Sequence, residues 1–205
     1  MTPRSYRLGR RQAAVDRTRA RILKAARAVL ARGGELSIDA VARRARVTRA
    51  TVYQRFGSRP KLLQALFDDL AHEGSLWDLG KVFQVPDPSL ALAQFIAKFG
   101  HFWTVHRALQ RRLTALGALD AVFHRTLRAR QEWRREGLKV IVARVRARQR
   151  EGAQSTLAAH DAIDLLFTLT SFDSFDTLAG TERTPEQVTP LVMDVARKVL
   201  GITEV

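Results

Sequence analysis

The chain contains no cysteine, so disulfide bonds and thiolate metal sites are excluded. It also has no run of about twenty consecutive apolar residues, the length that a membrane-spanning helix requires. Its N-terminus is basic but lacks the apolar segment of a signal peptide. We therefore expect a cytoplasmic protein with no membrane partner.

Sequence patterns that support catalysis are missing as well. The chain has no H-E-x-x-H, G-x-x-x-x-G-K-[ST], G-x-S-x-G or G-x-G-x-x-G pattern. Its five histidines show no metal-ligand spacing along one helix face. We expect no enzyme activity, no cofactor and no bound metal.

Positive charge is abundant and unevenly placed. Residues 1–61 hold 17 Lys and Arg against 3 Asp and Glu, whereas residues 62–205 hold 18 against 17. A charge run is often only a solvated face. Nearly all of the excess lies in the first third, however, and this favours a polyanionic partner, nucleic acid before membrane.

Apolar residues recur at helical spacing throughout, with no convincing pair of strands, so the sequence predicts an all-α fold. We expect three parts. Residues 1–15 form a basic, mobile arm, which either lies along nucleic acid or is a tail adding nonspecific attraction. Residues 16–72 form a first, basic helical domain, and residues 73–205 form a second helical domain.

The first domain has the spacing of a helix-turn-helix. A helix from about Asp16 to Arg32 ends at Gly33-Gly34, and Ser37 is a good N-cap for the next. Thr48 then caps a short helix that stops at Gly57, and a leucine-rich helix follows. The alternative is a plain helical bundle with tight turns, which would leave the clustered charge unexplained.

The segment from Ile22 to Leu70 resembles the DNA-binding domain of the TetR family of transcriptional regulators. The matching stretches are I-L-K-A-A and L-S-I-D-A-V-A-R-R-A-R-V-T-R-A-T-V-Y-Q-R-F-G-S-R-P-K-L-L. Two positions depart from the family's pattern: Arg46 replaces a turn glycine, and Arg59 replaces a lysine. Arginine with a positive φ costs about 1 kcal/mol, unless a phosphate contact compensates.

At 100° per residue, Val52 and Phe56 set the inward direction of the helix that Thr48 caps. Ala50 and Gln54 then point outward, which suits a recognition helix in a major groove. Gln54 can pair with adenine, and the resemblance implies phosphate contacts from Tyr53, Ser37 and Arg59. The full set of expected DNA-binding residues is Ser37, Arg46, Thr48, Arg49, Ala50, Thr51, Tyr53, Gln54, Arg59 and Lys61.

Beyond residue 74 we expect helices over 89–106, 109–118, 119–150, 156–179 and 185–200. Aromatic residues at helical spacing are usually core. A divergent domain attached to a DNA reader is nevertheless where an effector pocket is expected. The candidate lining residues are Phe99, Phe102, Trp103, His106, Phe123, Phe172, Asp173 and Asp176.

Residues 161–179 carry apolar side chains on two opposite faces, so the predicted helix needs neighbours on both sides. It is either central in the monomer or part of a four-helix dimer interface with the last helix, as the resemblance also implies. The expected interface residues are Ile163, Leu166, Phe167, Thr170, Leu191, Val192, Val195 and Val199.

The arginine-rich stretch 125–150 is read as a solvated helix face or a second anionic contact.

These features together predict a homodimeric, sequence-specific DNA-binding regulator, specifically a repressor that responds to a small-molecule effector and binds a palindromic double-stranded operator. The alternative is a nonspecific architectural DNA-binding protein. The charge distribution alone fits either one.

Overall fold

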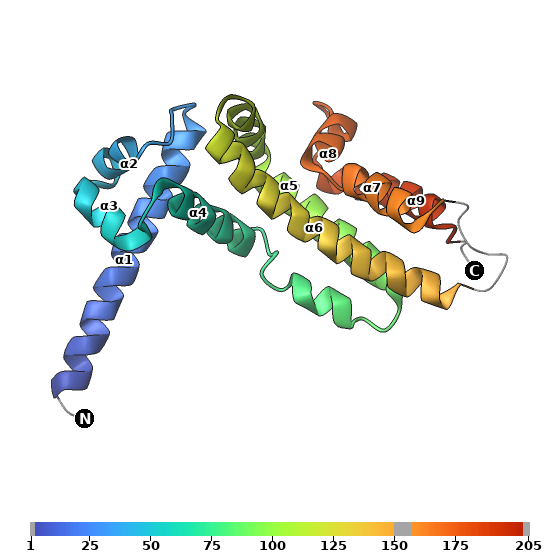
Figure 1. The fold of residues 1–205 in the computed structure, drawn as a ribbon, viewed down its shortest axis with the longest axis horizontal. Helices are drawn as coiled ribbons and strands as arrows, with labels where there is room; N and C mark the ends of the chain where they lie inside the picture. Colours follow the sequence, from blue (N-terminus) through green and yellow to red (C-terminus); the bar gives the residue numbers. More distant parts are fainter. Residues whose placement is uncertain (1–2, 150–156, 203–205) are drawn as a thin grey trace. The chain divides into compact units, whose positions relative to one another are not determined.

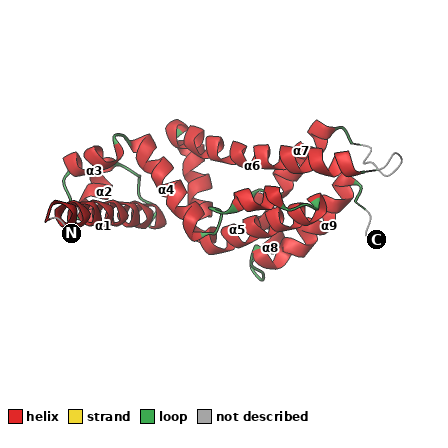
Figure 2. Ribbon diagram, turned by 90° about the horizontal axis from the view of Figure 1, so that it is seen from below, coloured by secondary structure: helices red, strands yellow, loops and turns green. Residues whose placement is uncertain are grey.

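The computed structural model describes residues 3–149 and 157–202, with side chains from residue 12 onward, and every regular element in these ranges is a helix (Figures 1 and 2). The all-α prediction is confirmed. No helix of the described ranges is long and apolar enough to cross a membrane. In chain order, the elements are α1 (Pro3–Ala31), α2 (Ile38–Ala45), α3 (Arg49–Phe56), α4 (Arg59–Glu73), η1 (Leu79–Gln84), α5 (Pro88–Leu119), α6 (Ala121–Arg148), α7 (Ala159–Leu169), α8 (Phe172–Ala179), η2 (Glu186–Val188) and α9 (Thr189–Leu200).

The chain divides into two compact units. The N-terminal unit comprises Met1–Asp69 and Arg111–Thr126, and the C-terminal unit comprises Leu70–Gln110 and Leu127–Val205. The sequence-based domain limits stay a prediction. The N-terminal unit also includes the end of α5 and the start of α6, which no local pattern indicated.

Caps and turns define α2 and α3 in the N-terminal unit. The Ser37 hydroxyl accepts a hydrogen bond from the Ala40 backbone N–H at 3.2 Å, and the Thr48 hydroxyl accepts one from Thr51 at 3.1 Å. Between the helices, Arg46 has φ 53° and ψ 49°, the left-handed conformation that ends α2. The short helices are thus positioned by their own terminal residues. Buried apolar side chains beneath them include Ile22, Leu30, Val41, Val52, Leu62 and Leu66.

The start of the first helix differs from the sequence-based expectation. The backbone is helical from Pro3, so the first helix begins well before the expected start at about Asp16. That residues 1–15 form a mobile arm stays a prediction. Arginine and alanine are strong helix formers, and extending an existing helix is much easier than nucleating one. Residues 1 and 2 lie outside the described residues.

Helix boundaries in the C-terminal half also differ. The two helices expected over 89–106 and 109–118 are one continuous helix, α5. The single helix expected over 156–179 is instead α7 and α8, because the Ser171 side chain accepts from the Ser174 N–H at 3.2 Å and starts a new helix. Phe172 therefore does not share a helix face with the apolar residues of α7.

The last predicted helix starts in two steps. A capping box precedes it: Gln187 N–H donates to the Thr184 hydroxyl at 3.2 Å, and Thr184 N–H donates to the Gln187 side chain at 2.8 Å. It opens only the short 3-10 turn η2, and α9 begins at Thr189. Helix α9 packs against α7, and η2 packs against α8.

Close packing in the C-terminal unit depends on two glycines. A Cβ atom at Gly100 would lie 2.3 Å from the Thr189 hydroxyl, and one at Gly137 would lie 2.9 Å from the Phe95 ring. Side chains at these positions would push α5 away from the start of α9 and α6 away from α5. The core between these helices includes Phe95, Ile96, Leu138, Ile141 and Phe175.

Candidate nucleic-acid interface

The outer face of α3 is polar and open. Val52 is fully buried and Phe56 nearly so, whereas Arg49, Ala50, Tyr53, Gln54 and Arg55 are exposed. Thr51 is half-buried. Exposure therefore agrees with the direction assigned to this helix from its sequence, and the groups that can reach a base edge point away from the core.

Arg49 and Thr51 are held by neighbours in the same unit. Arg49 Nε lies 2.9 Å from a carboxylate oxygen of Asp39 on α2, and both side chains are at least half exposed. The hydroxyls of Thr48 and Thr51 lie 2.9 Å apart. An exposed ion pair of this kind contributes at most about 1 kcal/mol, so Arg49 can exchange Asp39 for a phosphate or a base at little cost.

Three further candidate DNA-binding residues lie near the ends of α2 and α3. Arg46 keeps the left-handed backbone that the sequence predicted to be strained, and its side chain is exposed. Lys61 is exposed near Gly57, and Ser37 is half-buried because its hydroxyl caps α2. Arg46 and Lys61 therefore present cations at the surface, while Ser37 is already used within the unit.

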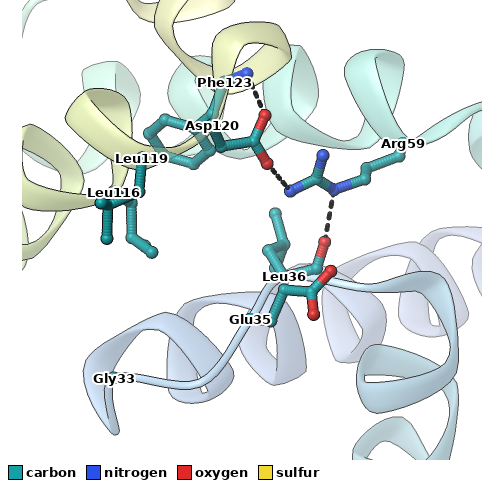
Figure 3. A pocket seen from close by; sticks show the side chains of 8 residues that line it. All are labelled: Gly33, Glu35, Leu36, Arg59, Leu116, Leu119, Asp120 and Phe123. Atoms are coloured by element: carbon teal, nitrogen blue, oxygen red, sulfur yellow. Dashed lines mark hydrogen bonds and ion pairs between the residues drawn. The ribbon is translucent and has the colours of Figure 1, made fainter.

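Arg59 is placed differently from the expectation. Its Nε donates to the Leu36 carbonyl at 2.6 Å, and its Nη2 lies 2.5 Å from the Asp120 carboxylate (Figure 3). Asp120 also caps α6, since it accepts from the Val122 and Phe123 N–H groups at 3.0 Å. The guanidinium thus joins the loop before α2 to the α5–α6 junction, and in this conformation it is not available to a phosphate.

A pocket of about 420 Å³ lies beside this ion pair, lined by the eight residues labelled in Figure 3. Phe123 is one of them, and its ring meets Phe67 edge-on with centroids 6.2 Å apart. Phe123 therefore belongs to the N-terminal unit and is separated from the other effector candidates, which lie in the C-terminal unit.

The Arg59 hydrogen bond and the Phe123 N–H hold the pKa of Asp120 below its ordinary value. A carboxyl with a depressed folded pKa stabilises the fold above its unfolded pKa, and this contribution is lost as the pH falls through the folded pKa. Asp120→Asn, which keeps a capping group but removes the charge, is expected to cost about 1 kcal/mol at neutral pH. Urea unfolding should show this difference shrinking below about pH 4. A difference that stays constant with pH would show that the ion pair is not its source.

The aromatic effector candidates form one cluster in the C-terminal unit. Phe99 and Trp103 have ring centroids 5.8 Å apart, Trp103 and Phe172 are 5.6 Å apart, and Phe102 lies 4.8 Å from Trp103. His106 joins the edge of the cluster, with its Nε2 3.0 Å from the Leu70 carbonyl. Phe99, Phe102, Trp103 and His106 lie on α5, whereas Phe172 reaches the cluster from α8.

The two acidic effector candidates are placed differently from the rings. Asp176 pairs with Arg107, whose Nε lies 2.6 Å from its carboxylate, and Asp173 is exposed. The sequence reading missed Arg107, which also donates to the Arg183 and Gly180 carbonyls. It also missed Arg134 on α6, which is only 4% exposed. Arg134 shares the helical spacing of the buried Leu138, Ile141 and Val145, a signal that was present in the sequence.

The predicted dimer residues divide into two groups. Leu191 and Val195 on α9 are exposed, and Ile163, Phe167 and Val199 are half-buried. Leu166, Thr170 and Val192 are completely buried within their own unit, so we remove them from the surface that can meet a second copy. Leu165, which the sequence reading left out of the interface, is 47% exposed and joins that surface.

Within the described ranges, no three His, Asp or Glu side chains are grouped so that they could hold a metal ion. The polar groups gathered on α3 are instead hydrogen-bond donors, acceptors and cations.

Comparison with known proteins agrees with this geometry. Residues 22–66 match the family model described as bacterial regulatory proteins, tetR family. No curated protein sequence matches the chain significantly.

Solved structures with similar folds include three regulators. NalD, the secondary repressor of the MexAB-OprM multidrug efflux pump in Pseudomonas aeruginosa, has 18% identity and a TM-score of 0.66, over 91% of this chain and 97% of NalD. The regulator FadR from Bacillus subtilis, solved with stearoyl-CoA, has 15% identity and a TM-score of 0.62, over 90% and 99%. A transcriptional regulator from a Rhodococcus species has 17% identity and a TM-score of 0.61, over 91% and 99%. The chain therefore has the fold of TetR-family transcriptional regulators, and its residues 22–66 match the model of that family.

Proposed function

We propose that this protein is a repressor that binds a palindromic DNA operator as a homodimer and responds to a small-molecule effector. The observation that carries the proposal is the exposed outer face of α3, which presents Arg49, Ala50, Thr51, Tyr53 and Gln54 above a buried Val52 and Phe56. A helix with small and polar outward groups enters a major groove, where a bulky apolar face would be excluded.

The contacts on α3 divide into two kinds. Gln54 can donate to and accept from the edge of an adenine, and Ala50 or the Thr51 methyl can meet a thymine methyl. Tyr53, Arg46 and Lys61 are exposed around this face and suit phosphate oxygens, which fix register without reading sequence. Arg49 at the first turn suits either role once it leaves Asp39.

Dimerisation is supported by the exposed apolar surface of α7 and α9. Leu165, Leu191 and Val195 are each more than a third exposed, and these two helices pack against each other. Two-fold pairing through this surface gives two recognition helices and hence a palindromic operator. Response to an effector is supported by the internal aromatic cluster, and FadR, which has a similar fold, was solved with the amphipathic ligand stearoyl-CoA.

The proposal is tested by fluorescence anisotropy with duplex DNA from beside the protein's own gene and with a scrambled duplex, each at two salt concentrations. A preference of about 10³-fold or more that persists at the higher salt is expected of a site-specific regulator. Equal binding to both duplexes that collapses together with salt favours the architectural alternative or an operator elsewhere in the genome. Selection from a random duplex library separates those two.

Gln54→Ala is expected to weaken operator binding by about 1–3 kcal/mol and to relax the base preference at one position in each half-site, because the bidentate contact to one base is lost. Tyr53→Phe on the same helix is the matched control, and we expect it to weaken binding to all sequences uniformly. The measurement is a binding competition against operators substituted at each position. An unchanged preference at every position in Gln54→Ala would remove Gln54 from the base readers.

A further inference from the structure

A buried arginine stands in the C-terminal unit without a carboxylate partner. Arg134 on α6 is 4% exposed, and no acidic group of the described residues forms a salt bridge with it. Asp173 and Glu132 attract the Arg134 guanidinium electrostatically, but only at longer range. Burial of a guanidinium destabilises the fold unless an anion or a full set of hydrogen bonds compensates.

The hydrogen bonds of Arg134 use only one of its three nitrogens. Nη1 donates to the Phe167 carbonyl at 2.6 Å and to the Thr170 hydroxyl at 2.8 Å. Nε and Nη2 have no acceptor among the described residues. Both atoms keep accessible surface, since neither is among the sealed side-chain atoms that lack a partner. These two nitrogens form the edge of the guanidinium that presents parallel N–H groups, the geometry that a carboxylate accepts with both oxygens.

Apolar rings surround this arginine. The guanidinium carbon lies 4.2 Å from the Phe167 ring centroid and 5.9 Å from that of Phe99. Phe99 continues into Trp103 and Phe172 through the ring contacts described above. These three rings keep 6 to 8% exposure, whereas the neighbouring Phe95 and Phe175 are completely sealed. The rings near Arg134 are therefore apolar and keep some accessible surface, which Phe95 and Phe175 do not.

Arg134 remains a cation under physiological conditions. Desolvation, with a smaller effect from the neighbouring Arg135, lowers the pKa of Arg134 to about 9, which is still above neutral pH. The unit thus holds a permanent positive charge among aromatic rings, with its bidentate edge unoccupied by any described residue.

We propose that Arg134 binds the carboxylate of a small amphipathic ligand within the C-terminal unit, with the apolar body of that ligand lying against Phe99, Trp103 and Phe172. This assignment rests on the proposed function, since it names the chemical class of the effector. Amphipathic ligand sites combine apolar walls with a few fixed polar groups, as this cluster does.

The same arginine connects the site to α7. Its Nη1 holds the last turn of α7 through Phe167 and Thr170, and Trp103 donates from Nε1 to the Thr170 carbonyl at 3.2 Å. A carboxylate on the Nε–Nη2 edge repositions the guanidinium and, with it, the end of α7. Since α7 carries part of the proposed dimer surface, ligand binding and DNA binding become coupled, as reciprocity between two linked sites requires.

The first test is isothermal titration calorimetry on the full chain without DNA, using decanoate, decan-1-ol and decylamine below their aggregation concentrations. Saturable binding of decanoate that is at least tenfold tighter than binding of the alcohol is expected, with no binding of the amine. Equal binding of decanoate and decan-1-ol, or no saturable binding of decanoate, would overturn the assignment.

The second test uses variants of adjacent arginines. Arg134→Met is expected to weaken decanoate binding by about ten- to a hundredfold, since a charge-assisted bidentate contact is lost. Arg134→Lys keeps the charge but not the paired donors, so an intermediate loss is expected, and this variant serves if the methionine variant fails to fold. Arg135→Met is the matched control: Arg135 lies over the same Phe167 ring at 4.0 Å but pairs with Asp164 and Glu132. Unchanged decanoate affinity in folded Arg134→Lys or Arg134→Met would assign Arg134 to holding α7 alone.

The two hypotheses fail separately. Absence of any sequence preference, in the selection from a random duplex library as well as in the anisotropy experiment, refutes the regulator, whatever decanoate does. Sequence-specific DNA binding without any carboxylate binding leaves the regulator intact and refutes only the role of Arg134.

Discussion

Replacing Leu191 and Val195 together by glutamate is expected to convert the proposed dimer into monomers and to lower operator affinity by about 10²–10⁴-fold. Both side chains are exposed on α9, where an apolar surface continues onto Leu165 of α7. A glutamate at each position places charges in a desolvated contact, and two-fold symmetry repeats them on both copies. Each DNA-binding unit then binds one half-site alone, without the high effective concentration that the second half-site provides in a linked pair.

Size-exclusion chromatography with light scattering measures the oligomeric state, and anisotropy with the operator measures affinity. The matched control is the double substitution Leu90→Glu and Val105→Glu, at two similarly exposed apolar positions on α5 in the same unit. The control is expected to stay dimeric. A dimer that survives the α9 substitutions, or one that only the α5 substitutions dissociate, would move the interface away from α7 and α9.

The helix-turn-helix was predictable because its determinants are local. Ser37, Thr48 and Gly57 end or begin helices through contacts within four residues, and the inward pair Val52 and Phe56 follows from helical spacing. The left-handed turn at Arg46 was anticipated from the family resemblance, because Arg46 stands where the TetR pattern has a turn glycine. Such contacts can be predicted from the sequence, because the two residues that make each contact lie within four positions of each other.

The placement of other side chains depends on partners that lie far apart in the chain. Arg59 was expected at the DNA surface, but its partner Asp120 lies 61 residues away, and no local pattern links the two. Arg134 was included in a basic run that was read as a solvated helix face or a second anionic contact. Its buried position follows from the stripe that it shares with Leu138 and Ile141, and charge outweighed that spacing in the sequence reading. The break between α7 and α8 was missed because Ser171 lies inside an otherwise continuous apolar pattern.

Phe56→Ala is expected to destabilise the N-terminal unit by about 3–5 kcal/mol and to abolish specific DNA binding, while the protein remains a dimer. Phe56 and Val52 are the only buried residues of α3, and an eight-residue helix does not persist in water without such packing. A loss of this size removes most of the stability of a typical small unit. Hydrogen exchange should therefore show faster exchange of the α3 amides, and light scattering should show an unchanged mass.

Tyr53→Ala on the same helix is the control that separates folding from contact. Tyr53 is 45% exposed, so its loss is expected to change the free energy of unfolding by no more than about 0.5 kcal/mol and still to weaken binding to all DNA. Slow exchange of the α3 amides in Tyr53→Ala and fast exchange in Phe56→Ala, with weak DNA binding in both, would show that α3 acts through its outer face and depends on its inner one. Specific DNA binding by Phe56→Ala at wild-type affinity would instead show that α3 does not need its buried anchor, and the recognition surface would then have to lie elsewhere in the N-terminal unit.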